Sequence, residues 1–202
     1  MLIGDNKMKL TDAYITLDPG HGGSDPGAVK YIKEAFIALR VCKYARGYLK
    51  SKGVKVHMTR TTDKHVGLTP RVTSANQKKT HLYVSVHLNA ATSEEASGAE
   101  CWHSINGDTG KTLAKNILLE LKDIGQNMHS ASGKIGGAMK TKKNENGEDY
   151  YYVIRATNMP AVIAELGFVT NKKDARDIDT KKEQKIYGEA IAKGIIKTLE
   201  SM

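Results

Sequence analysis

Two histidines in this 202-residue sequence each follow a run of β-branched and apolar residues. The segment Leu17–Gly23 places His21 in a glycine-rich turn, and the segment Leu82–Ala90 places His87 at the end of a second run. Residues just beyond the carboxyl ends of strands line the ligand crevice of α/β sheets, so two strands can direct both imidazoles into one crevice. A lone histidine is more often structural, and a glycine-rich turn can also bind phosphate. The pair, however, suggests a zinc site, because imidazole nitrogen is a common zinc ligand.

Glu34 is the candidate for a third ligand, since a catalytic zinc takes three protein ligands and leaves one position for water. It is the first residue of a predicted helix, and the loop before it can fold it back over the strand ends. Alone, Glu34 is better interpreted as an acidic residue stabilised by the helix dipole. Together, His21, Glu34 and His87 have the wide spacing of a catalytic site, because the ligands of structural zinc sites cluster at short spacing.

Glu165 adds a carboxylate at the end of an apolar run, in the segment Met159–Asn171. Burying an acid there is costly unless it faces a crevice or a partner, so Glu165 is a candidate general base. Beside a metal it would accept a proton from water and return it to a leaving amine, as metal-assisted amide hydrolysis requires.

The elements that must position these side chains form an α/β pattern, in which short β-branched runs alternate with segments of helical period. This pattern is typical of a mostly parallel sheet covered by helices. The predicted strands are Ala13–Leu17, Val54–Met58, Leu82–His87, Gly98–His103 and Ala161–Leu166. The predicted helices are Glu34–Ser51, Thr69–Gln77, Thr112–Ile124 and Lys181–Leu199. Gly53 is expected to be a left-handed residue that ends the first helix. In the second helix, Thr69 is the expected N-cap and Pro70 takes the first helical position.

The chain length suits a single domain, which we expect to span residues 13–202 after an N-terminal extension of residues 1–12. The polar stretch 129–149 predicts a surface loop, and such loops often border active sites. Cys42 and Cys101 are expected to be buried thiols, because two cysteines cannot form a dense disulfide framework.

The net charge of +9 favours polyanionic partners. Nucleic acid, anionic lipid and anionic cell-wall polymer all qualify, but nucleic acid is not expected, because the basic residues are dispersed and lack an interleaved aromatic stripe. The first 14 residues lack the apolar stretch of a signal peptide, and no window approaches the length of a membrane span. We therefore expect synthesis in the cytoplasm without an export signal, and no insertion into a membrane.

The sequence resembles the zinc-dependent N-acetylmuramoyl-L-alanine amidases of type 3, a family of cell-wall autolysins and phage endolysins. The resemblance runs from Ile15 to about Leu199. The matching motifs are DPGHGGSDPGA around His21, Lys33-Glu34, SVHLNA around His87 and AELGFVTN around Glu165, supported by Thr59–Asp63, Leu68–Asn76, Gly98–Glu100 and Arg155. One departure is the sequence Glu-Ala-Phe at residues 34–36, which leaves Glu34 as the only nearby carboxylate expected to bind the metal.

The resemblance implies a single α/β domain with a mostly parallel, about six-stranded twisted sheet flanked by helices. It implies one Zn²⁺ per chain bound by His21, Glu34 and His87, with Glu165 as catalytic base. The implied substrate is peptidoglycan, cut between N-acetylmuramic acid and L-alanine, which would lyse or remodel the cell wall. Asn89 and Arg155 are expected to contact this substrate.

Three other functions remain open at this point: a non-catalytic wall-binding module, a zinc exopeptidase or deacetylase, and a basic nucleic-acid binder. We expect a monomer that acts at the cell wall after release by lysis, either a phage lysin or a mother-cell autolysin. Because the sequence ends at Met202, directly after the last predicted helix, we expect either a minimal enzyme or an excised catalytic domain. Structural or surface roles are expected for the remaining histidines, His57, His65, His81, His103 and His129. Tyr150–Tyr152 are predicted to pack in the sheet, with sugar stacking as the alternative.

Overall fold

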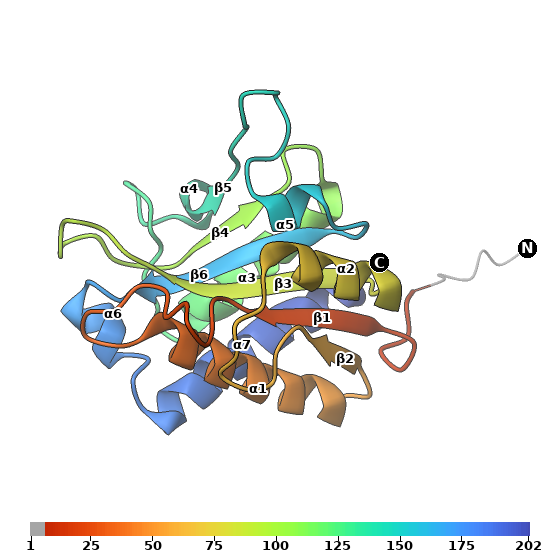
Figure 1. Cartoon of the computed structure of the whole chain (residues 1–202), viewed down its shortest axis with the longest axis horizontal. Coiled ribbons are helices and arrows are strands. Elements are labelled where there is room, and N and C mark those ends of the chain that lie inside the picture. The colour runs from red at the N-terminus through yellow and green to blue at the C-terminus, as the bar shows by residue number, and fades with distance from the viewer. Residues whose placement is uncertain (1–6) are drawn as a thin grey trace, which may run out of the picture.

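The computed structural model describes residues 7–202 and contains one six-stranded sheet (Figure 1). The strands are β1 (Tyr14–Pro19), β2 (Lys55–Met58), β3 (Leu82–Asn89), β4 (Glu100–His103), β5 (Met139–Lys140) and β6 (Ala161–Phe168). Their order across the sheet is β2-β1-β3-β6-β4-β5. Strands β2, β1, β3 and β6 are parallel, and β4 runs antiparallel to β6. The carboxyl ends of β1, β3 and β6 therefore meet the amino end of β4 at one edge.

Helices cover both faces of the sheet. They are α1 (Glu34–Ser51), α2 (Leu68–Lys78), α3 (Asp108–Asp123), α4 (Ile135–Ala138), α5 (Tyr152–Arg155), α6 (Lys172–Arg176) and α7 (Lys181–Leu199). In Figure 1, α2 and α5 lie in front of the strands, whereas α3 and α7 pass behind them.

The two faces bury different cores because side chains alternate along each strand. The larger core packs the strands against α1, α3 and α7 and includes Val84 and Val86 of β3. The smaller core packs the opposite face against α2 and α5 and includes Tyr83 and Ile163. His87 follows Tyr83 at an even spacing on β3, so it lies on the face of the smaller core, at the strand's carboxyl end.

The two longest predicted helices are confirmed at both ends, namely α1 and α7. Gly53 adopts a φ of 86°, as predicted for a left-handed residue after α1. The predicted start of α2 is wrong, because Gly67 is the N-cap and Thr69 makes no capping bond. Pro70 thus occupies the third helical position, where its missing N–H is also harmless, since the first four N–H groups of a helix have no intrahelical partner. The third long helix begins at Asp108, one turn before the predicted Thr112.

All five predicted strands are present, with shifted ends. Strands β3 and β6 extend two residues beyond their predicted ends, and β4 begins at Glu100 rather than Gly98. Gly98 has a φ of 95°, which is incompatible with a regular strand. The sixth strand, implied by the family resemblance, is the two-residue β5.

The stretch 129–149 is not entirely a loop, because it contains α4 and β5. Beyond β5 the chain forms a turn closed by the bridge between Lys143 and Asp149, and this segment protrudes at the top of Figure 1. Tyr150–Tyr152 are not part of the sheet, in which they were predicted to pack, since Tyr152 begins α5 and the two residues before it lie outside the strands. Instead, Tyr151 and Tyr152 pack against the smaller core from outside the sheet.

Both cysteines are free and buried, as predicted. Within residues 7–202, no helix combines the length and apolar composition that a membrane span requires. Of the N-terminal extension expected over residues 1–12, residues 1–6 lie outside the described part of the chain.

Candidate metal centre

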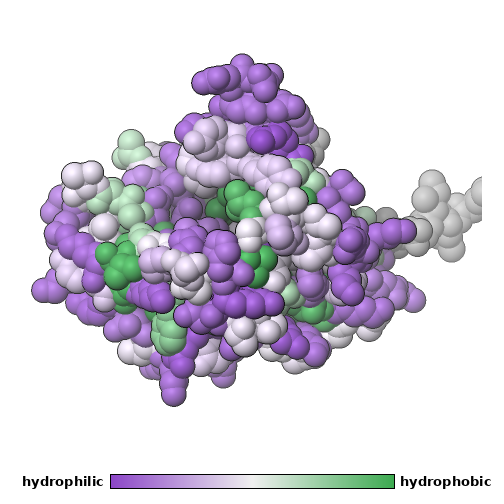
Figure 2. Space-filling view, in the orientation of Figure 1, coloured by the Kyte–Doolittle hydropathy of each residue, from purple (hydrophilic) through white to green (hydrophobic). Residues whose placement is uncertain are grey.

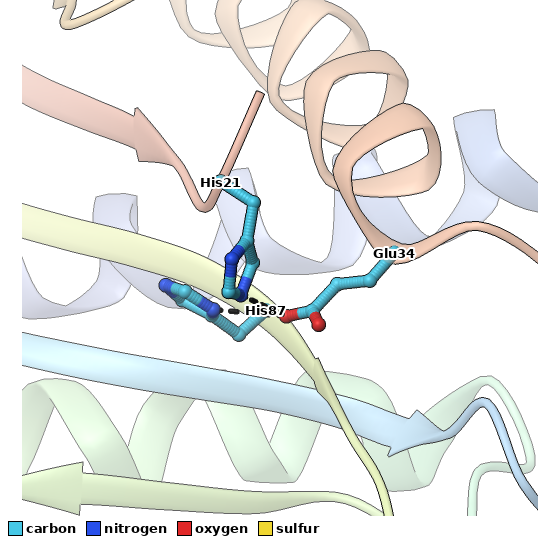
Figure 3. Close-up of side chains that lie close together, drawn as sticks. All are labelled: His21, Glu34 and His87. Atoms are coloured by element: carbon cyan, nitrogen blue, oxygen red, sulfur yellow. Dashed lines mark hydrogen bonds and ion pairs between the residues drawn. The ribbon is translucent and has the colours of Figure 1, made fainter. Parts of the chain in front are cut away.

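His21, Glu34 and His87 converge at the sheet edge where β1 and β3 end (Figure 3). His21 follows β1, Glu34 is the first residue of α1, and His87 lies near the end of β3. Glu34 Oε1 is 3.1 Å from His21 Nε2 and 2.9 Å from His87 Nδ1. The three potential ligand atoms all lie within 4.8 Å of one another.

The Glu34 carboxylate is fixed by backbone groups as well as by the imidazoles. The Ala28 N–H donates to Oε2 at 2.8 Å, and the Leu88 N–H donates to Oε1 at 3.1 Å. Burial alone would raise the pKa of Glu34, but the hydrogen bonds and charges of His21 and His87 outweigh it and hold the pKa well below its ordinary value. Glu34 is therefore a fixed anion at the centre of the cluster.

His21 is oriented by Asp25, a carboxylate that the sequence argument missed. His21 Nδ1 is 2.8 Å from Asp25 Oδ2, which directs Nε2 toward Glu34. The hydrogen bond to Glu34, supplemented by Asp25, raises the pKa of His21 to about 9. Among residues 7–202, Glu34 is the carboxylate that joins the potential ligand cluster, whereas Asp25 contacts it through His21. The sequence feature that could have indicated this contact is the position of Asp25, four residues after His21 in the same glycine-rich turn.

Two glycines allow the backbone to approach this cluster. A Cβ on Gly20 would lie 2.2 Å from His87 Cε1, and a Cβ on Gly27 would lie 2.5 Å from Glu34 Oε2. Gly27 also has a φ of 64°, and His21 itself adopts a left-handed φ of 57°. A non-glycine residue in this conformation is uncommon and often marks a functional site.

Glu165 lies beside the cluster on β6, where its register partner on β3 is His87 and its partner on β4 is Glu100. Glu165 Oε2 is shielded from solvent and has no hydrogen-bond partner within residues 7–202. Burial raises the pKa of Glu165 to about 7; the charge of His87 opposes this effect, and Glu34 and Glu100 add to it. The carboxyl can therefore exchange a proton near neutral pH.

A cavity of about 280 Å³ opens next to these residues. Its lining includes His21, His87 and Glu165 together with Tyr151 and Tyr152. Figure 2 shows a hollow near the centre of this face with hydrophobic surface in and beside it. The tyrosines therefore contribute both to the smaller core and to the cavity wall, a position from which they can contact a bound molecule.

The two residues expected to contact substrate do not line this cavity. The Asn89 amide donates to Glu100 at 2.9 Å, and its carbonyl oxygen accepts from the Ala90 N–H. The Arg155 guanidinium donates to the carbonyls of Asp149 and Tyr150 and borders a different cavity. Arg155 thus holds the end of the protruding segment against α5 through carbonyls close to it in the sequence.

Most other histidines contact neighbouring protein groups, as predicted for structural residues. The contacts are His57 with Ser74, His81 with the Tyr14 N–H, His103 with the Ser104 carbonyl and His129 with the Ser97 carbonyl. His65 differs because it lines the cavity.

The donor set fits a zinc ion. Two imidazole nitrogens and one carboxylate oxygen are the ligands of a common catalytic zinc type, and one potential ligand atom of each residue lies within 4.8 Å of the others. The cluster lies at the carboxyl edge of the sheet, and Glu165, a carboxyl of raised pKa, lies beside it. These features define an α/β protein with a candidate hydrolytic metal site.

The chain belongs to the N-acetylmuramoyl-L-alanine amidase family, whose model matches residues 15–197. It is 33% identical to the probable cell wall amidase LytH of Staphylococcus saprophyticus over 94% of this chain and 60% of that protein. It is 30% identical to the germination-specific N-acetylmuramoyl-L-alanine amidase of Bacillus subtilis, over 94% of this chain and 81% of that protein.

Among solved structures, Cwp6 from Clostridium difficile superposes with a TM-score of 0.85 at 36% identity, covering 92% of this chain and 29% of that one. The chain thus spans less than two thirds of LytH and of Cwp6.

Proposed function

We propose that this chain is a zinc-dependent amidase that hydrolyses the bond between N-acetylmuramic acid and L-alanine in peptidoglycan. The observation that carries the proposal is the convergence of His21, Glu34 and His87 beside Glu165 at one cavity. Family membership supplies the substrate class. The action at the cell wall, as a lytic or remodelling enzyme, follows from that substrate.

His21, Glu34 and His87 would hold the zinc. A zinc ion at this position supplies Lewis acidity toward the scissile carbonyl and lowers the pKa of water. Asp25 keeps His21 Nε2 directed at the site, and the backbone N–H groups of Ala28 and Leu88 keep the Glu34 oxygens in place. Because these partners are already in position, little reorganisation is needed when the ligand set is completed.

Glu165 carries out the proton transfers. With a pKa of about 7 and with Oε2 unpartnered among residues 7–202, its carboxylate can accept a proton from the attacking water. The same carboxyl then returns the proton to the nitrogen of the departing L-alanine, which leaves as an amine. The bond from carbonyl carbon to nitrogen breaks, and the lactyl group is released as a carboxylic acid.

The cavity wall provides binding surface next to these groups. Tyr151 and Tyr152 present aromatic surface on one side, and Leu68 contributes aliphatic surface near the start of α2. A cavity of about 280 Å³ is too small for a long polymer segment, so we propose that it receives only the groups next to the scissile bond. The net charge of +9 would favour association with anionic wall polymers.

Two alternatives make different predictions. A non-catalytic wall-binding module has no need for a carboxyl of raised pKa beside a cluster of three potential metal ligands, so the presence of both supports catalysis. A zinc exopeptidase or deacetylase would use the same metal chemistry but would release different products. The products of digestion therefore distinguish these functions.

The test is digestion of purified peptidoglycan by the zinc-loaded chain. We expect new amino groups without new reducing sugar ends, and mass spectrometry should find released peptides that begin with a free L-alanine. Treatment with a chelator should abolish the release and added Zn²⁺ should restore it, whereas His87→Ala should stay inactive with or without added metal. New reducing ends, or peptides that begin at any other residue, would refute the proposed bond.

A further inference from the structure

Two buried arginines hold the backbone that carries His21. Arg60 follows β2 and Arg71 lies on α2, and only 1% and 4% of their surfaces are exposed. Neither touches the potential ligand atoms through its guanidinium. Both instead donate to carbonyl groups at the end of β1 and in the loop that follows it.

The contacts cover three consecutive carbonyls. Arg60 donates to Pro19 O at 2.9 Å and to Gly20 O at 2.7 Å. Arg71 donates to Pro19 O at 2.6 Å and to His21 O at 2.7 Å. Pro19 is the last residue of β1 and Gly20 and His21 follow it, so the arginines supply donors to buried carbonyls at the point where regular strand pairing ends. The two guanidiniums thereby fix the peptide planes on both sides of the left-handed His21.

Arg60 also joins this loop to the helix that carries the second ligand. Its Nη2 donates both to Gly20 O and to Ala35 O, the latter at 2.8 Å, and Ala35 directly follows Glu34 in α1. One guanidinium thus spans the segments that carry His21 and Glu34. Within residues 7–202, Arg60 forms no ion pair with a carboxylate, whereas Arg71 pairs with Asp18 at 2.7 Å.

We propose that Arg60 and Arg71 are positioning residues that set the direction of His21 relative to Glu34 and so determine the affinity of the metal site. We name the two residues the arginine clamp. This inference rests on the metal site in the proposed function. The planar guanidinium is required because it presents several N–H donors in a fixed fork, which the single ammonium of lysine cannot reproduce.

The charge of Arg60 and its hydrogen bonds to the backbone predict opposite changes in metal affinity when the residue is replaced. A positive charge near a cation site opposes metal binding, so loss of the charge alone would strengthen binding. Loss of the clamp would weaken it, because partners that orient metal ligands typically contribute about 10–100-fold in metal affinity. Arg60→Lys keeps the charge and loses the fork, and Arg60→Met loses both.

The experiment measures Zn²⁺ affinity by competition with a chromophoric chelator, and thermal stability of the metal-free proteins. The control is Ile195→Val, a buried change on α7 that lowers stability on the opposite face of the sheet. We expect Arg60→Lys and Arg60→Met to bind Zn²⁺ at least about tenfold more weakly than the wild type. The control should retain wild-type affinity despite its lower Tm. The visible spectrum of the Co²⁺-substituted Arg60→Lys protein should also change, because it reports ligand geometry.

Wild-type affinity in the Arg60 variants, or tighter binding by Arg60→Met, would overturn the clamp and leave Arg60 with a purely structural role. If these variants do not fold, Arg71→Lys is measured in the same way, and unchanged affinity there would overturn the inference. Failure of the wild-type protein to bind Zn²⁺ would instead refute the proposed metal site, and the inference with it.

Discussion

Replacing Glu165 with glutamine should abolish most turnover and, at the same time, stabilise the metal-free protein at alkaline pH. The substitution keeps the size of the side chain and removes its ability to exchange a proton. General acid–base catalysis commonly contributes about 10²–10⁴-fold to the rate, which corresponds to about 3–5 kcal/mol of activation free energy. We expect kcat to fall by that factor while the zinc content stays at the wild-type value.

The stability effect follows from the environment of the carboxyl. Burial raises the pKa of Glu165 from an ordinary value of 4.5 to about 7, so the folded protein keeps a proton that the unfolded chain releases in this interval. Stability therefore falls as pH rises from about 4.5 to about 7. The difference in pKa corresponds to about 3 kcal/mol. Because the cavity admits water near the carboxyl, we expect about 1–3 kcal/mol.

The assay is urea unfolding of chelator-treated proteins at about pH 4 and about pH 8. Glu165→Gln should match the wild type at the lower pH and exceed its stability at the higher pH. The matched control is Glu145→Gln in the exposed turn before α5, which should change neither kcat nor the pH dependence. Turnover within tenfold of the wild type would refute Glu165 as the base. A variant less stable than the wild type at pH 8 would refute the argument from burial.

Three further substitutions test the parts of the site separately. His87→Ala should keep its fold and lose bound zinc, as measured by metal analysis after dialysis; retention of one zinc per chain would exclude His87 as a ligand. Asp25→Asn should weaken Zn²⁺ binding about 10–100-fold in a chelator competition, because the hydrogen bond that orients His21 is weakened. Asp18→Asn should cost about 3–5 kcal/mol in urea unfolding at neutral pH, because it leaves the buried Arg71 without its counter-charge. Burial alone would raise the pKa of Asp18, but Arg71 and two hydroxyl donors hold this pKa below its ordinary value. The cost of the substitution should therefore shrink as the pH falls below about 3.8, because the wild-type carboxyl then becomes protonated as well.

Local sequence patterns were sufficient for the long elements. Helix α7 has its N-cap at Thr180, which accepts from the Glu183 N–H, and its apolar stripe continues to Leu199. Helix α1 and Gly53 have equally local signals. The short elements α4, α5, α6 and β5 were not predicted, because segments of two to five residues are stabilised by tertiary contacts rather than by periodicity.

The site residues that lie at strand ends or in family motifs could be predicted from the sequence. His21, Glu34, His87 and Glu165 were selected from the sequence, and the structure brings all four together. The arginine clamp and the contacts of Asn89 and Arg155 could not be found in this way. Arg60 reaches carbonyls 40 residues away along the chain, and a donor's long-range partner has no counterpart in local spacing.

The central claim is that one zinc ion is bound by His21, Glu34 and His87 beside Glu165. Its most direct test is anomalous diffraction at the zinc absorption edge from crystals of the zinc-loaded chain. We predict a single strong peak at about 2.0–2.2 Å from His21 Nε2, His87 Nδ1 and a Glu34 oxygen. A peak bound by other side chains, or no peak between these three residues in protein that carries zinc, would contradict the account.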